Sequence, residues 1–164
     1  DRPLSRGLGD VYKRQLYSPG HAKHHYTFYD TESKIIFMGD TLGLIYPHGD
    51  FVQPNLPPPD FNKDLLFQTL EDISKLELNS IAIAHFGIHN KPYELIDSSI
   101  SNIEKWLDFT KNINDLSDEE AAKKLAFWVE NNYQSLNIDT ETIKNYIDNS
   151  NFQMQVTGIR NYFK

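Results

Sequence analysis

The sequence predicts an α/β domain followed by an all-helical extension. Three observations indicate this: short apolar and aromatic runs typical of strands lie in the first half of the chain, helical periodicity dominates the second half, and all six histidines fall between positions 21 and 89. With 164 residues, 39% of them hydrophobic, the chain is long enough to bury a substantial core. We divide it into residues 1–15, 16–97 and 98–164.

The composition excludes several classes of function. The net charge is −7, from 23 acidic and 16 basic residues, and the basic candidates Lys23 and Lys91 are isolated, so nucleic acid is a poor partner. No stretch approaches the roughly 20 apolar residues of a membrane span. Cysteine is absent, so any metal must be held by histidine and carboxylate, which suits zinc, iron or manganese. We expect a cytoplasmic protein with a small-molecule substrate and leave its oligomeric state open.

Residues 1–15 differ from the rest of the chain. They carry a net charge of +2, which leaves −9 (−7 minus +2) for the remainder, and they show no helix or strand period. The run 9–15, Gly-Asp-Val-Tyr-Lys-Arg-Gln, resembles peptides obtained when sequencing-adapter DNA is translated at the end of an assembled fragment. We therefore expect a non-native, adapter-derived segment, with an ordinary disordered arm as the alternative.

The first elements after this segment are predicted to be strands. Residues 24–30 and 34–39 are rich in β-branched and aromatic side chains, and the polar residues 31–33 between them predict a hairpin. A loop over about 41–60 follows, with several glycines and a run of three prolines, and a loop of that length is usually functional or mobile.

A helix is predicted from about Asn62 to Leu78, capped by Asp60 or Asn62, because Leu66, Leu70 and Ile73 form an apolar stripe. The short apolar run 80–84 then predicts a buried strand. The order strand, helix, strand fits a layered α/β architecture.

Four further helices are predicted after Pro92, which suits the first turn of a helix. Ile96, Ile100, Ile103 and Leu107 recur at helical spacing, and Ser117 to Glu120 form a capping-box pattern that opens a second helix through about Tyr133. The last two are expected from a cap at Asp139 or Thr140 to about Asn149, and over residues 152–164, although Gly158 disfavours the final helix. Trp106 and Trp128 fit helix packing better than a binding site.

Three short motifs place metal-ligand side chains at the ends of apolar stretches. They are Pro19-Gly20-His21, Gly39-Asp40-Thr41 and Ala84-His85 followed by Phe-Gly. Glycine permits a tight backbone at such a turn, and a carboxylate leaving an apolar strand is costly to bury unless it is paired or bound to a metal. Each motif alone is as well explained by an ordinary turn, but the order His, Asp, His at successive strand ends favours a metal centre.

Together these motifs resemble the C-terminal half of the metallo-β-lactamase superfamily over residues 16–97. The resemblance implies an αβ/βα sandwich of which this chain carries the second half, followed by the helical extension. It also implies that His21 ligates the first of two divalent metal ions, most commonly zinc, that Asp40 bridges both ions and is catalytic, and that His85 ligates the second. The implied activity is cleavage of an ester or thioester by metal-bound hydroxide, as in glyoxalase II-like members.

The sequence departs from this family in one respect that bears on activity. The remaining ligands of the family come from an upstream His-x-His-x-Asp-His motif, which is absent here. We therefore expect the chain as given to be an inactive, N-terminally truncated hydrolase with an exposed apolar sheet face. The alternatives are an iron-dependent oxidoreductase on the same scaffold and a non-catalytic domain that binds proteins through its helical tail.

Other polar residues are weaker candidates. The resemblance makes His25 a support for the metal ligands, while His24, one position earlier on the expected strand, should face the opposite side. His89 and Lys91 follow the second histidine ligand and are candidates to meet an anionic substrate, although solvent-exposed loop positions explain them equally well. His48, in the long loop, is a candidate for the mouth of a pocket.

Overall fold

A computed structural model of the chain describes residues 12–45, 51–85, 87–134 and 138–164. The strands are β1 (Lys13–Tyr17), β2 (Tyr26–Asp30), β3 (Ile35–Gly39), β4 (Ser80–Ile83) and β5 (Gly87–His89). The helices are α1 (Lys63–Ser74), α2 (Pro92–Lys111), α3 (Asp118–Gln134), α4 (Thr140–Asp148) and α5 (Phe152–Tyr162). The predicted mixed α/β class is confirmed. Within the described residues, no helix combines the length and apolar character needed to cross a membrane.

The five strands form one sheet in the order β1-β2-β3-β4-β5. β2 is antiparallel to both β1 and β3, β3 and β4 are parallel, and β4 and β5 are antiparallel. Strands β1, β3 and β4 therefore run in the same direction. Because the carboxyl ends of strands that run in one direction meet at one edge of the sheet, the residues that follow these three strands lie near one another.

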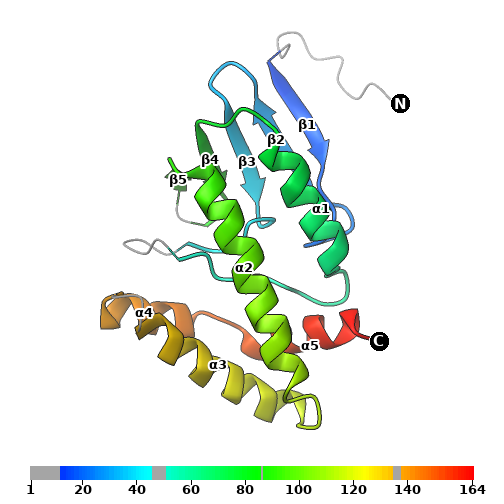
Figure 1. Cartoon of the computed structure of the whole chain (residues 1–164), viewed down its shortest axis with the longest axis vertical. Helices are drawn as coiled ribbons and strands as arrows, with labels where there is room; N and C mark the ends of the chain where they lie inside the picture. The colour runs from blue at the N-terminus through cyan, green and yellow to red at the C-terminus, as the bar shows by residue number, and fades with distance from the viewer. Residues whose placement is uncertain (1–11, 46–50, 86, 135–137) are drawn as a thin grey trace.

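One face of the sheet is covered by helices. Figure 1 shows α1 and α2 lying across it, with α2 continuing beyond the sheet toward the other helices. The side chains on this face alternate with exposed ones along β2 and β3, so that Tyr29, Ile36 and Met38 are buried while their neighbours are not. Leu66 and Leu70 of α1 complete the layer and are almost fully buried.

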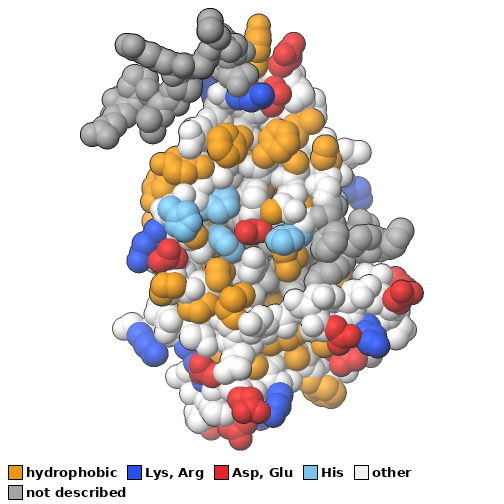
Figure 2. All heavy atoms as spheres, turned by 180° about the vertical axis from the view of Figure 1, so that it is seen from behind, with side chains coloured by type: hydrophobic (Ala, Val, Ile, Leu, Met, Phe, Trp, Pro, Cys, Tyr) orange, Lys and Arg blue, Asp and Glu red, His pale blue; other side chains and the backbone are white. Residues whose placement is uncertain are grey.

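The opposite face of the sheet is apolar and exposed. Register places Phe28, Phe37, Ala82 and Ile88 in one row across β2 to β5. Phe28 is 48% exposed, Phe37 47% and Ile88 60%. Figure 2 shows a band of hydrophobic side chains across this side of the molecule. Contiguous exposed apolar surface of this kind marks a contact site or an aggregation liability, as the sequence led us to expect.

Helix α3 packs against both α4 and α5, and α3 and α5 also pack against α2, which extends beyond the sheet. Trp106 of α2 is buried and its ring lies 5.7 Å from that of Phe152 in α5. The buried apolar residues form a single cluster that extends from the sheet into α5, where Val156 and Ile159 are fully buried. The helical extension thus shares the core of the sheet layer.

Hydrogen bonds show which of the predicted residues cap the helices. Asn62, rather than Asp60, caps α1, because its side chain accepts the Leu65 N–H. Asp139, rather than Thr140, caps α4. The capping box at the start of α3 forms as predicted, since Ser117 Oγ accepts the Glu120 N–H and the Glu120 carboxylate accepts the Ser117 N–H.

Several boundaries differ from those expected. β2 begins at Tyr26, so His24 and His25 precede the strand instead of alternating along it. β1 and β5 were not predicted, and β1 begins at Lys13, so that residues 13–15 of the segment assigned as non-native or disordered pair with β2. The division into three segments remains a prediction. The last helix forms despite Gly158.

Gly158 allows α5 to approach the loop between β3 and α1. A Cβ at this position would lie 1.9 Å from the carbonyl oxygen of Leu56, which is backbone and cannot move aside like a flexible side chain. Helix propensity alone predicts that Gly158→Ala stabilises the protein by up to about 1 kcal/mol. We expect the reverse, a loss of about 1–3 kcal/mol from overpacking, measured by urea unfolding. Asn161→Ala, at an exposed position of the same helix, is the control, and a stabilised Gly158→Ala protein would contradict the packing.

The exposed row of the sheet predicts a second result. Replacing Phe28 and Phe37 by threonine removes two large exposed rings from adjacent strands without touching the buried face, so binding of a hydrophobic dye and concentration-dependent self-association should both decrease. Phe127→Gln is the control, because Phe127 is 67% exposed but lies on α3. Unchanged dye binding in the double variant, or an equal decrease in the control, would show that the sheet face is not the adhesive surface.

Candidate metal centre

The three predicted ligands meet at one edge of the sheet. His21 follows β1, Asp40 follows β3 directly, and His85 follows β4 after one residue. A backbone hydrogen bond holds the segments that carry Asp40 and His85 side by side, since the Ala84 N–H donates to the Gly39 carbonyl over 3.1 Å. Figure 2 shows imidazoles gathered around a carboxylate below the hydrophobic band.

Asp40 lies between the two histidines. His85 Nε2 is 3.2 Å from Asp40 Oδ1, and His21 Nε2 is 3.9 Å from Asp40 Oδ2. Each carboxylate oxygen therefore faces a different imidazole. Oδ1 is buried and accepts no hydrogen bond from any described residue. An acceptor in this state calls for a partner such as an ion, because buried polar atoms are nearly always satisfied.

His25 fixes the backbone at Asp40. The Asp40 N–H donates to His25 Nε2 over 3.4 Å, and His25 Nδ1 lies 3.0 Å from Thr41 Oγ1. Gly39 has a φ of 56°, and a Cβ there would lie 2.7 Å from His25 Nε2, so only glycine fits between the strand and the ring. The pKa of His25 lies below its ordinary value, mainly because the ring is partly buried and secondly because His21 is nearby. The ring thus tends to stay neutral and able to accept the Asp40 N–H.

His21 is oriented by two segments distant in sequence. Gly20 has a φ of 125°, and a Cβ there would lie 2.3 Å from Leu66 Cα, so the turn packs directly against α1. His21 Nδ1 lies 3.0 Å from the carbonyl oxygen of Asn55. Since a carbonyl only accepts, Nδ1 carries a proton, and in the neutral ring Nε2 then presents its lone pair toward Asp40. Metal-binding histidines commonly donate their other N–H to a backbone carbonyl in this way.

Comparison of folds found solved structures whose backbone resembles this chain. The metallo-β-lactamase family protein TTHA1429 from Thermus thermophilus aligns over 92% of this chain with a TM-score of 0.62 and 16% identity. The metallo-β-lactamase superfamily protein ST1585 from Sulfolobus tokodaii aligns over 94% with a TM-score of 0.56 and 21% identity. The chain has part of the metallo-β-lactamase fold.

The matched region is less than half of each of these two structures. The alignment covers 43% of TTHA1429 and 48% of ST1585. A third structure, TTHA1623 in a di-iron-bound form, is 28% identical over 57% of this chain, but its TM-score of 0.39 is too low to establish a common fold. No family model matches the sequence, and no curated protein matches it.

The donors fit part of a metallo-β-lactamase-type centre. Two imidazole nitrogens and a carboxylate whose two oxygens face different histidines suit a pair of divalent ions with Asp40 between them. Each position then has two protein donors, whereas a catalytic zinc ion commonly has three. Consistently, no group of three or more His, Cys, Asp or Glu side chains placed to hold one ion occurs within the described residues.

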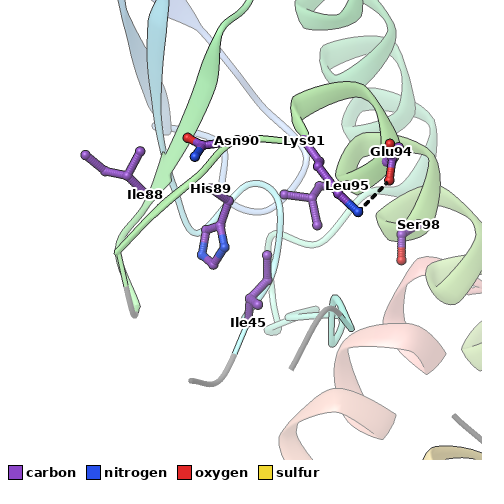
Figure 3. A pocket seen from close by; sticks show the side chains of 8 residues that line it. All are labelled: Ile45, Ile88, His89, Asn90, Lys91, Glu94, Leu95 and Ser98. Carbon is purple, nitrogen blue, oxygen red and sulfur yellow. Dashed lines mark ion pairs between the residues drawn. The ribbon is translucent and has the colours of Figure 1, made fainter. Parts of the chain in front are cut away.

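The remaining predicted site residues are not placed at this centre by the structure. His24 is exposed. His89 and Lys91 line a different pocket of about 500 Å³ beside Ile45 and Leu95, shown in Figure 3. There Lys91 pairs with Glu94 of the same helix turn, with Nζ 3.5 Å from the carboxylate. Their predicted contact with substrate gains no support from this placement. His48 lies outside the described residues.

The sequence analysis missed the residues that position the ligands. Asn55 holds His21 through its carbonyl, and Gln155 holds Asn55 in turn, because Gln155 Nε2 donates to Asn55 Oδ1 over 3.3 Å. Gln155 Oε1 also accepts the Leu56 N–H over 2.5 Å. The only signal in the sequence was the length of the loop that contains Asn55, which indicated function without indicating which residue carries it.

The Asn55 carbonyl predicts the protonation of His21. In its neutral form the His21 ring should be the Nδ1–H tautomer, observable as distinct ring ¹⁵N shifts in two-dimensional NMR spectra. His24, which is exposed and makes no ring hydrogen bond to the described residues, is the internal control and should show tautomer averaging. A His21 ring protonated on Nε2 would contradict the orientation of its lone pair toward Asp40.

Proposed function

We propose that the chain is part of a metal-dependent hydrolase whose centre includes His21, Asp40 and His85. The observation that carries the proposal is the placement of one carboxylate between two imidazoles at the carboxyl ends of three strands, with one carboxylate oxygen buried and without a hydrogen bond from the described residues. The likeness of fold to two metallo-β-lactamase proteins supports it.

Each residue has a separate task in this proposal. His21 and His85 would supply nitrogen donors to divalent ions, and Asp40 would supply oxygen donors together with a negative charge that offsets theirs. His25 holds Asp40 in place through the backbone N–H. The chemistry that divalent ions held by these residues would supply is activation of water near neutral pH and polarisation of an ester or thioester carbonyl. No serine or cysteine nucleophile is then needed. Zinc is the ion that we propose.

The centre needs donors beyond these three residues. Two protein donors at each position hold an ion weakly, and the described part of the chain supplies no third histidine or carboxylate to either position. We propose that a His-x-His-x-Asp-His segment supplies them in the active protein. Ester or thioester hydrolysis by the 164-residue chain alone should therefore be negligible.

Metal binding by the chain tests the role of Asp40. Asp40→Asn keeps the size of the side chain and removes its charge, so the affinity for Zn²⁺ measured by calorimetry should fall by more than about 10-fold. Asp97→Asn, an exposed carboxylate on α2, should leave the affinity unchanged. In a longer form that includes the upstream ligand motif, Asp40→Asn should reduce hydrolysis by more than about 100-fold.

Two results would overturn the proposal. Equal Zn²⁺ affinity in the chain and in Asp40→Asn would remove Asp40 from the centre. Full ester or thioester turnover by the longer Asp40→Asn protein would show that hydrolysis does not use this carboxylate. Retention of iron in place of zinc during purification would favour the oxidoreductase alternative.

A further inference from the structure

A pocket of about 430 Å³ lies beside the metal centre, between the sheet edge and the helical extension. His85 and Asn55 line it on the side of the centre. The turn between α4 and α5 and the first residues of α5 line it on the other side, through Asn149, Ser150, Asn151 and Gln155. A group bound in this pocket is therefore held next to a residue of the proposed centre.

The lining is polar and carries no formal charge other than the potential charge of His85. It contains five side-chain amides and one hydroxyl, with Leu44 and Met154 as its apolar side chains, and no Lys, Arg, Asp or Glu among the described residues. An uncharged group that both donates and accepts hydrogen bonds suits such a lining.

Three asparagines of the lining each use one end of the side-chain amide in a hydrogen bond within the protein. Asn55 Oδ1 accepts from Gln155, Asn149 Nδ2 donates to the Asn145 carbonyl over 2.9 Å, and Asn151 Oδ1 accepts the Met154 N–H over 3.0 Å. The opposite ends make no hydrogen bond to a described residue. They are two donors, Asn55 Nδ2 and Asn151 Nδ2, and one acceptor, Asn149 Oδ1.

Two donors and one acceptor are complementary to a secondary amide, whose carbonyl oxygen accepts two hydrogen bonds and whose N–H donates one. We propose that this pocket binds an uncharged secondary amide in the arm of the substrate, next to the ester or thioester bond that is cleaved. That an ester or thioester bond is cleaved next to this amide rests on the proposed hydrolase function. The pocket and its binding preference do not depend on turnover.

A pair of neutral esters tests the preference. N-acetylglycine methyl ester carries the amide, and methyl levulinate replaces its N–H by a methylene group at the same position. Titrated into the ¹⁵N-labelled chain, the amide ester should shift the side-chain NH₂ signals of Asn55 and Asn151 and should bind about 3- to 10-fold more tightly than methyl levulinate, the range expected for one uncharged hydrogen bond. Equal affinity for the two esters, or shifts confined to other residues, would overturn the proposal.

Two variants separate the pocket from helix capping. Asn151→Ser keeps a side-chain oxygen at the cap of α5 but replaces the amide NH₂ group by a shorter hydroxyl, so binding of the amide ester should weaken about 3- to 10-fold. Asn62→Ser makes the same change at the cap of α1, which is outside the pocket, and should leave binding unchanged. An equal loss in both variants would attribute the effect to stability and overturn the assignment.

The outcomes for the pocket and for the hydrolase can be told apart. If the amide ester binds as expected while Asp40→Asn leaves Zn²⁺ affinity unchanged, the pocket is supported and the hydrolase is not. If Asp40→Asn weakens Zn²⁺ binding while the two esters bind equally, the centre is supported and the amide preference is overturned.

Discussion

The arrangement of the proposed metal centre depends on two buried glutamine amides that join the helical extension to the loop between β3 and α1. Gln155 accepts the Leu56 N–H and donates to Asn55, and Gln53 accepts the Tyr133 hydroxyl over 3.1 Å and donates to Ser150. Gln53 is 1% exposed and Gln155 is 4% exposed. Separating the loop from the helices would leave these amides and their partners unpaired, at a cost of about 1–3 kcal/mol for each buried group.

This constraint makes the helical extension part of the site. The loop that it holds carries the Asn55 carbonyl, and that carbonyl sets which nitrogen of His21 faces Asp40. The same helices form one wall of the pocket beside His85. A change in the packing of α5, as at Gly158 against the Leu56 carbonyl, therefore acts on His21 through the loop that carries the Asn55 carbonyl.

The sequence predicted those parts of the structure that follow from local pattern. The periodicity of hydrophobic residues predicted β2, β3, β4 and the helices. The motifs at the strand ends predicted that Asp40, His21 and His85 lie close together. β1 was missed because its Lys-Arg-Gln start is polar and lies at the sheet edge, and β5 because it has three residues. Asn55 and Gln155 are 100 positions apart, and their hydrogen bond leaves no trace in the periodicity of either segment.

A single covering element could account for two features of the sheet, its exposed apolar row and its incomplete set of donors. The sheet buries one face under α1 and α2 and exposes Phe28, Phe37 and Ile88 on the other, while the donor set at its carboxyl edge is incomplete within the described residues. Both the exposed row and the imidazole cluster lie on the side shown in Figure 2. An element that covered the row would remove apolar surface from water at about 25 cal/mol per Å². Because the row and the imidazole cluster lie on one side of the molecule, an element that covered the row would also lie near Asp40, where the proposed centre needs further donors.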